Sequence, residues 1–156
     1  MEPVAFEVVG IPVPQGSLRP MVSRSTGKPF LAQDQNLLRY RADLRAIALE
    51  VMARDERALM PWAVALHVTF TLPRPAYHFL PVNTKRTEPE VKPDAPVFPF
   101  GPPDLDKLCR AVLDALTGIV YLDDAQVIRL NGRKIFSDEP TFGGLTTITV
   151  FGGDAA

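Results

Sequence analysis

Crowded prolines constrain the fold of this chain more than any other sequence feature. Nine of its 16 prolines fall between Pro73 and Pro103. Proline lacks a backbone N–H and has a fixed φ, so such a stretch cannot form a helix interior or a central strand. We therefore expect residues 73–103 to form an extended, poorly ordered loop, with the core built from the segments on either side.

Before this loop, three segments carry the hydrophobic patterns of regular structure. Residues 4–9 are predicted as a first strand, and a glycine- and proline-rich loop follows from Gly10. From Asp34, a plausible N-cap, to about Arg54, apolar residues recur at three- and four-residue spacing, which predicts an amphipathic helix. Residues 64–72 alternate between apolar and more polar side chains, as a half-buried strand does.

The chain after the loop predicts a second helix and two more strands. The helix spans about 105–117 and stops at Gly118, and the strands lie around 126–136 and 145–151. The order strand, helix, strand, helix, strand, strand indicates an α/β fold, with one mixed sheet packed against two main helices. A length of 156 residues suits one core, so we expect residues 1–156 to form a single domain.

Composition limits the kinds of metal site and partner. A single cysteine, Cys109, excludes an intramolecular disulfide and a multi-cysteine zinc site, and two distant histidines make a histidine-based metal centre unfavourable. Any metal would therefore be held by oxygen. The formal net charge of −1 does not by itself indicate nucleic-acid binding, so a DNA site must rest on local basic patches.

No apolar run of 18 residues is present, and the first residues lack a basic region followed by an apolar stretch. On these grounds we expect a soluble protein that stays in the cytoplasm and has no membrane partner.

Five aspartates lie within residues 102–127. Two prolines force extended backbone just before Asp104, so Asp104 and Asp106 should straddle the start of a helix and meet at one point. The simplest interpretation is an N-cap and a favourable first-turn acid. Asp123 and Asp124 follow the helix after a short turn, which lets the chain return toward the same sheet end.

Several carboxylates close together repel one another unless a cation is present. Mg²⁺ takes oxygen ligands, and it can activate water and stabilise charge on a phosphodiester. Arg110 lies four residues after Asp106 on the same helical face. It can pair with that carboxylate or contact the phosphate to be cut.

These residues resemble the core motif of RusA-type Holliday junction resolvases. The matching segments are Asp104-Leu-Asp-Lys-Leu, Asp114-Ala-Leu-Thr and Asp123-Asp-Ala-Gln-Val. Gly10, Pro12, Gly16 and Arg19 also resemble the amino-terminal pattern of many phage-borne members.

The resemblance implies a magnesium-dependent endonuclease of DNA recombination and repair, with Mn²⁺ as an alternative metal. It implies that Asp104, Asp106 and Asp124 bind the metal and that Asp123 is a neighbour. Arg110 takes the place of a lysine that assists catalysis in the family, although arginine cannot deliver a proton. Because two strands of a four-way junction must be cut symmetrically, we expect a homodimer.

Basic residues near these acids supply a candidate DNA surface. Residues 10–33 carry three basic side chains and no acid, and the first predicted helix adds more. Such a run is commonly a solvated face, but a carboxylate site that cuts a polyanion needs positive surroundings. The predicted DNA-binding residues are Arg19, Arg24, Lys28, Arg41, Arg45 and Lys107.

Two other functions are compatible with the residues. One is a related nuclease that prefers flaps or other branched DNA, because the choice of branch depends on dimer geometry. The other is a non-catalytic DNA-binding module in which the acids are structural. The intact aspartate set argues against the second.

Overall fold

A mixed four-stranded sheet carries the fold. The computed structural model describes residues 2–16, 19–32 and 34–153. The sheet order is β1 (Val4–Val9), β8 (Leu145–Gly152), β4 (Val64–Leu72) and β7 (Val127–Phe136). β8 pairs antiparallel with both neighbours, and β4 pairs parallel with β7. The predicted α/β class with one mixed sheet is confirmed.

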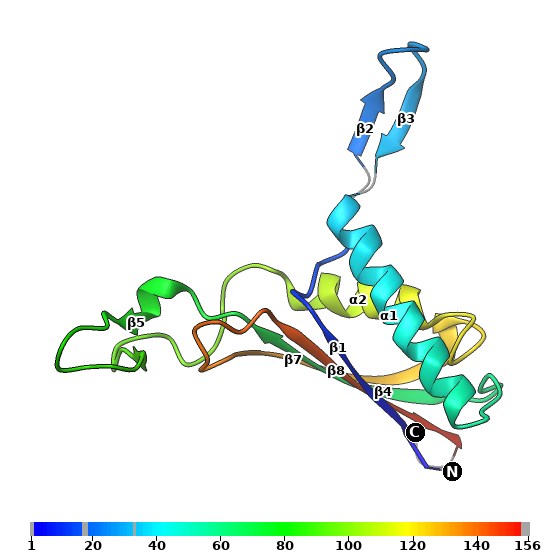
Figure 1. The fold of residues 1–156 in the computed structure, drawn as a ribbon. Helices are drawn as coiled ribbons and strands as arrows, with labels where there is room; N and C mark the ends of the chain where they lie inside the picture. Colours follow the sequence, from blue (N-terminus) through cyan, green and yellow to red (C-terminus); the bar gives the residue numbers. More distant parts are fainter. Residues whose placement is uncertain (1, 17–18, 33, 154–156) are drawn as a thin grey trace.

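Two helices cover one face of this sheet (Figure 1). The first, α1 (Gln35–Arg54), begins where predicted, because the Oδ1 of Asp34 accepts a hydrogen bond from the Asn36 N–H at 2.8 Å. The second, α2 (Leu105–Leu116), is followed by Gly118 at a φ of +76°, a conformation that glycine adopts without strain. Alternate residues of β1, β4 and β8 face the helices and form the core with them.

The two helices are joined to each other and to β7 at specific points. The guanidinium of Arg41 lies 3.8 Å from Asp114, and Arg45 donates to the Ala115 carbonyl at 3.2 Å. On the sheet side, a Cβ at Gly132 of β7 would lie 2.6 Å from the Sγ of Cys109 in α2. The absence of a side chain at Gly132 therefore lets α2 pack closely on β7.

A hairpin that the sequence did not predict projects from this body (Figure 1). Its strands are β2 (Arg19–Val22) and β3 (Pro29–Ala32), where we expected only loop to about residue 20. At its turn Ser23 N–H donates to the Lys28 carbonyl at 2.9 Å. Its prolines argued against a strand, but a two-stranded ribbon consists only of edges, and edges tolerate proline.

The proline-rich stretch forms a second projection and has more regular structure than predicted. It contains a 3₁₀ turn, η1 (Ala76–His78), and a short hairpin of β5 (Phe79–Leu80) and β6 (Glu90–Val91). Buried Arg74 anchors its base, donating to the Pro96 carbonyl at 2.9 Å while its guanidinium lies 4.8 Å from the Phe136 ring centre. Tertiary anchoring of this kind is not visible in proline spacing.

Among the described residues, no helix combines the length and the apolar character needed to cross a membrane.

Candidate active site

Asp104 and Asp106 lie on either side of Leu105, the first residue of α2, so they straddle the helix start as predicted. Asp104 is the N-cap residue with extended backbone (φ −67°, ψ 133°), and Asp106 is in the first turn. The Asp104 side chain does not cap the helix; its Oδ2 lies 2.8 Å from the Nζ of Lys107. The hydrogen bond and charge of Lys107 lower the pKa of Asp104.

A lysine from the sheet fixes the segment that carries these acids. The Nζ of Lys134 in β7 donates to the carbonyls of Gly101 and Pro103, both at 2.8 Å. The start of α2 is thereby held against the second half of β7. The charge of Lys134 also contributes to the lowered pKa of Asp104.

The two neighbouring aspartates Asp123 and Asp124 differ: Asp123 caps a turn, and Asp124 is exposed. Asp123 caps the 3₁₀ turn η2 (Asp124–Gln126): its Oδ1 accepts from Ala125 N–H at 2.8 Å, and its own N–H donates to Gln126 Oε1 at 2.9 Å. Asp124 is exposed, and no described residue donates a hydrogen bond to its carboxylate. The assignment of Asp123 as a neighbour rather than a metal ligand stays a prediction.

The two aspartate groups lie at opposite ends of α2 and β7. Gln126 donates to the carbonyls of Met60 and Trp62, which places η2 beside the start of β4. Asp124 lies just before the amino-terminal end of β7. Asp104 lies near Lys134, in the carboxyl-terminal half of the same strand. At ~3.3 Å per residue, the strand from residue 127 to 134 spans roughly 23 Å.

We expected the chain after α2 to bring Asp124 back to the sheet end where Asp104 lies. Within one chain this expectation is wrong. No group of three or more histidine, cysteine or acidic side chains in the described ranges is arranged to hold a metal. The oxygen donors suit Mg²⁺ by their chemistry, but one chain does not bring all three together. The twelve-residue helix α2 lies between Asp104 and Asp124, and it ends one residue before the predicted end at Thr117.

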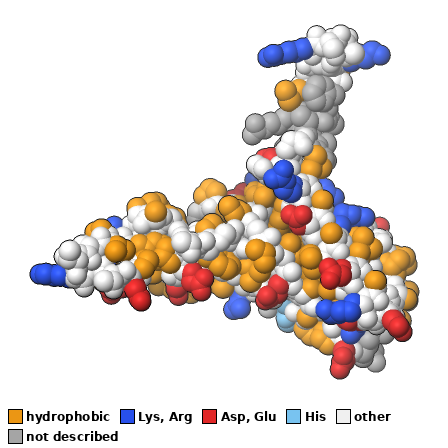
Figure 2. Space-filling view, in the orientation of Figure 1, with side chains coloured by type: hydrophobic (Ala, Val, Ile, Leu, Met, Phe, Trp, Pro, Cys, Tyr) orange, Lys and Arg blue, Asp and Glu red, His pale blue; other side chains and the backbone are white. Residues whose placement is uncertain are grey.

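The predicted basic residues occupy three different places. Arg110 is exposed one turn beyond Asp106. Arg24 and Lys28 are exposed in the turn of the β2–β3 hairpin, whose tip carries Lys and Arg side chains (Figure 2). The side chain of Arg19 lies outside the described part of the structure.

Lys107, Arg41 and Arg45 already have protein partners. Lys107 pairs with Asp104, and its pKa is raised by that hydrogen bond. Arg41 and Arg45 contact α2 and so join the two helices. Direct contact of these three residues with DNA stays a prediction.

One feature next to the aspartates was missed from the sequence. An apolar pocket of about 420 Å³ is lined in part by Pro102 and Pro103, the two residues that precede Asp104 in the chain. Phe98 and Phe100 were visible among the prolines, but their convergence with η1 and β7 depends on tertiary structure.

Comparison with known proteins agrees with the motif. Residues 12–143 match the family model described as endodeoxyribonuclease RusA. The uncharacterized protein YqaN of Bacillus subtilis (strain 168) is 28% identical over 140 residues, which cover 90% of this chain and 92% of YqaN. The family match spans both aspartate groups and most of the folded domain, so the chain belongs to the RusA endodeoxyribonuclease family.

Proposed function

We propose that this protein is a magnesium-dependent endonuclease that cuts branched DNA, with four-way junctions as the preferred substrate. The observation that carries the proposal is the endodeoxyribonuclease family match across residues 12–143, which includes exposed Asp106 and Asp124. A role in DNA recombination and repair follows from that substrate.

The proposed metal ligands are Asp104 and Asp106 of one chain with Asp124 of the partner subunit. Mg²⁺, or Mn²⁺ in its place, supplies activation of water and stabilisation of charge on the phosphate. Arg110 keeps a permanent positive charge beside Asp106 and binds a phosphate oxygen, but it moves no proton. Lys107 pairs with Asp104 at 2.8 Å, and this lowers the pKa of that carboxyl.

Two features support a homodimer. The aspartates are separated along α2, so three carboxylates can meet only between two chains. In addition, β7 is ten residues long and has a hydrogen-bonded neighbour on one side only among the described strands. Ile128 and Leu130 of this strand are 64% and 42% accessible. A long strand with an unpaired edge and exposed apolar side chains can pair with a second copy of the chain.

Antiparallel pairing of β7 with β7 of a second copy fits both features. In an antiparallel pair, the amino-terminal end of one strand lies beside the carboxyl-terminal end of the other. That arrangement brings Asp124 of the partner subunit toward the Asp104 end. A two-fold axis at Asn131 would set Arg129 opposite Arg133 of the partner subunit, so like-charge repulsion disfavours that register.

Cleavage by aspartate variants tests the proposal. We expect Asp104→Asn, Asp106→Asn and Asp124→Asn each to abolish magnesium-dependent cutting of an immobile junction while junction binding is kept, because each removes an anionic oxygen donor. Asp123→Asn is the matched control: asparagine is as good an N-cap as aspartate, so cutting should persist. Gel analysis of junction, flap and duplex substrates, with and without Mg²⁺, gives the readout.

Cutting retained in all three variants would overturn the proposed site. Cutting of flaps in preference to junctions would replace the substrate but keep the metal-dependent chemistry. Binding of junctions without any cutting by the wild-type protein would favour a non-catalytic DNA-binding module.

A further inference from the structure

We propose that the apolar pocket beside Asp104 binds one unstacked nucleobase of the branched DNA. The inference rests on the proposed function, because it takes branched DNA as the ligand. It adds a second recognition element, which is separate from the aspartates and acts on the base rather than on the phosphate.

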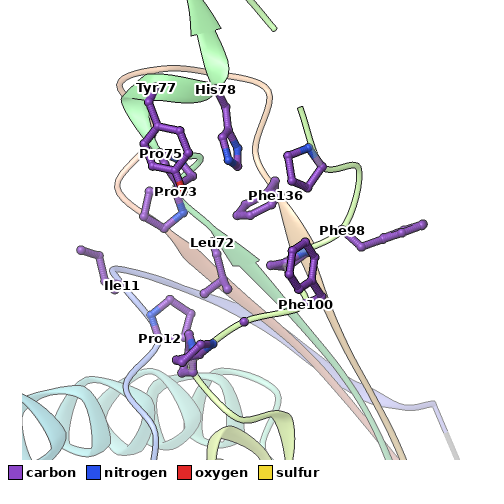
Figure 3. Close-up of a pocket in the computed structure, with 15 residues that line it drawn as sticks. Ile11, Pro12, Leu72, Pro73, Pro75, Tyr77, His78, Phe98, Phe100 and Phe136 are labelled. Atoms are coloured by element: carbon purple, nitrogen blue, oxygen red, sulfur yellow. The ribbon is translucent and has the colours of Figure 1, made fainter. Parts of the chain in front are cut away.

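The pocket is built where the proline-rich stretch folds back onto the ends of two strands (Figure 3). Its volume of about 420 Å³ is within the usual range for small-ligand sites, ~300–1,000 Å³. Leu72 of β4 and Phe136 of β7 lie on one side, and Ile11 and Pro12 lie near the sheet end. Prolines form much of the remaining wall, which favours a flat apolar ligand.

One buried polar atom on the wall has no partner. His78 is 5% exposed, and its Nδ1 has no hydrogen-bond partner among the described residues. Its ring is held edge-on between Tyr77 and Phe136, at centroid distances of 4.5 and 5.4 Å (Figure 3). A buried unpartnered nitrogen is costly. Because Nδ1 is covered by protein atoms, a ligand with a complementary polar edge removes that cost only if the His78 ring turns toward it.

Three of the side chains that line the pocket are exposed aromatic residues. Phe98 and Phe100 line it and yet are 66% and 88% accessible, and Tyr77 is 73% accessible. Exposed apolar side chains gathered in this way indicate a binding surface. Aromatic rings of this kind stack on any nucleobase, because every base has a π face.

The position of the pocket selects a nucleobase over other flat ligands. Its last lining residues, Pro102 and Pro103, lead directly into Asp104, with Lys107 and Lys134 beside that carboxylate. A phosphate held there places its own nucleotide within reach of the pocket. Bases in an intact duplex remain stacked, whereas a branch point offers bases that unstack at low cost. The pocket therefore favours branched over linear DNA.

The test combines a protein change with a DNA change. Dissociation constants are measured in Ca²⁺ for junctions with one abasic nucleotide at each position around the branch. We expect one position at which loss of the base weakens wild-type binding roughly tenfold, the size of a stacking contact. The double variant Phe98→Ala/Phe100→Ala should bind the intact junction with the same tenfold loss and be insensitive to the abasic position.

Val97→Ala is the matched control, since Val97 is 71% accessible in the same segment but does not line the pocket. The double variant should keep its melting temperature, because both phenylalanines are exposed. Equal abasic penalties in wild-type and variant proteins would overturn the pocket proposal while cutting remains. Loss of dimerisation in the variant would identify the pocket as a protein interface instead. Failure of the wild-type protein to bind junctions at all would overturn the proposed function together with this inference.

Discussion

At the scale of single residues, Gly132 controls how α2 sits on the sheet. A Cβ there would lie 2.6 Å from Cys109 Sγ, in a region where Cys109 is 5% exposed. Gly132→Ala should therefore lower the free energy of unfolding by about 1–3 kcal/mol, as overpacking of a core does. In a Cys109→Ala background the same substitution should cost much less, because the obstructing sulfur is absent. Urea denaturation of the four proteins measures this coupling.

Gly143→Ala is the control, because a Cβ at Gly143 meets nothing within 4 Å. An equal cost of Gly132→Ala in both backgrounds would show that the contact with Cys109 does not limit the packing.

At the scale of elements, the β2–β3 hairpin is a candidate DNA-binding arm. An isolated two-stranded hairpin is marginally stable alone, and its turn exposes Arg24 and Lys28 without an acidic neighbour. We expect Arg24→Gln/Lys28→Gln to weaken DNA binding and to reduce the log–log salt slope by roughly two, because each basic side chain that binds a phosphate adds about one to that slope. The cutting rate at saturating enzyme should be unchanged, because Arg24 and Lys28 lie in the turn of the hairpin, which projects away from the body that carries the aspartates (Figure 1). Binding titrations across salt concentrations give the slope.

Arg54→Gln serves as the control at the other end of α1, where Arg54 pairs with Asp55 at 2.8 Å. A salt slope that is the same in wild type and the hairpin variant would remove the arm from the DNA surface.

At the scale of the whole molecule, the separated aspartates predict a site shared by two chains. Inactive Asp106→Asn and Asp124→Asn proteins, once mixed and allowed to exchange subunits, should regain cutting, because a mixed dimer contains one intact set of ligands. Random exchange makes roughly half of the dimers mixed, and each mixed dimer has one intact site. Such a dimer should nick one strand without resolving the junction. Sedimentation should report twice the chain mass of 17.2 kDa.

Mixing Asp104→Asn with Asp106→Asn should restore nothing, because both ligands come from the same chain in every site. Equal recovery in the two mixtures, or none in either, would contradict a shared site.

Local patterns in the sequence were sufficient to predict the main elements of this protein. The predicted bounds of both long helices and of the four main-sheet strands agree closely with the structure. Capping and hydrophobic period depend on neighbouring residues, so they can be seen in the sequence. The hairpin at 19–32 was missed because its prolines were interpreted as breakers. The placement of Asp104 and Asp106 at the start of α2 was predicted for the same local reason, since two prolines precede the helix.

Tertiary structure alone decided where the elements placed their side chains. Parallel pairing of β4 with β7 set η2 and its Asp124 beside the start of β4, and no local pattern records that direction. Packing of α1 on α2 engaged Arg41 and Arg45, which sequence position alone presented as a DNA surface. The pocket likewise depends on contacts between residues more than 60 positions apart, such as Leu72 and Phe136. The sequence determined which chemical groups are present and what local structure they adopt, whereas long-range packing determined which of those groups meet.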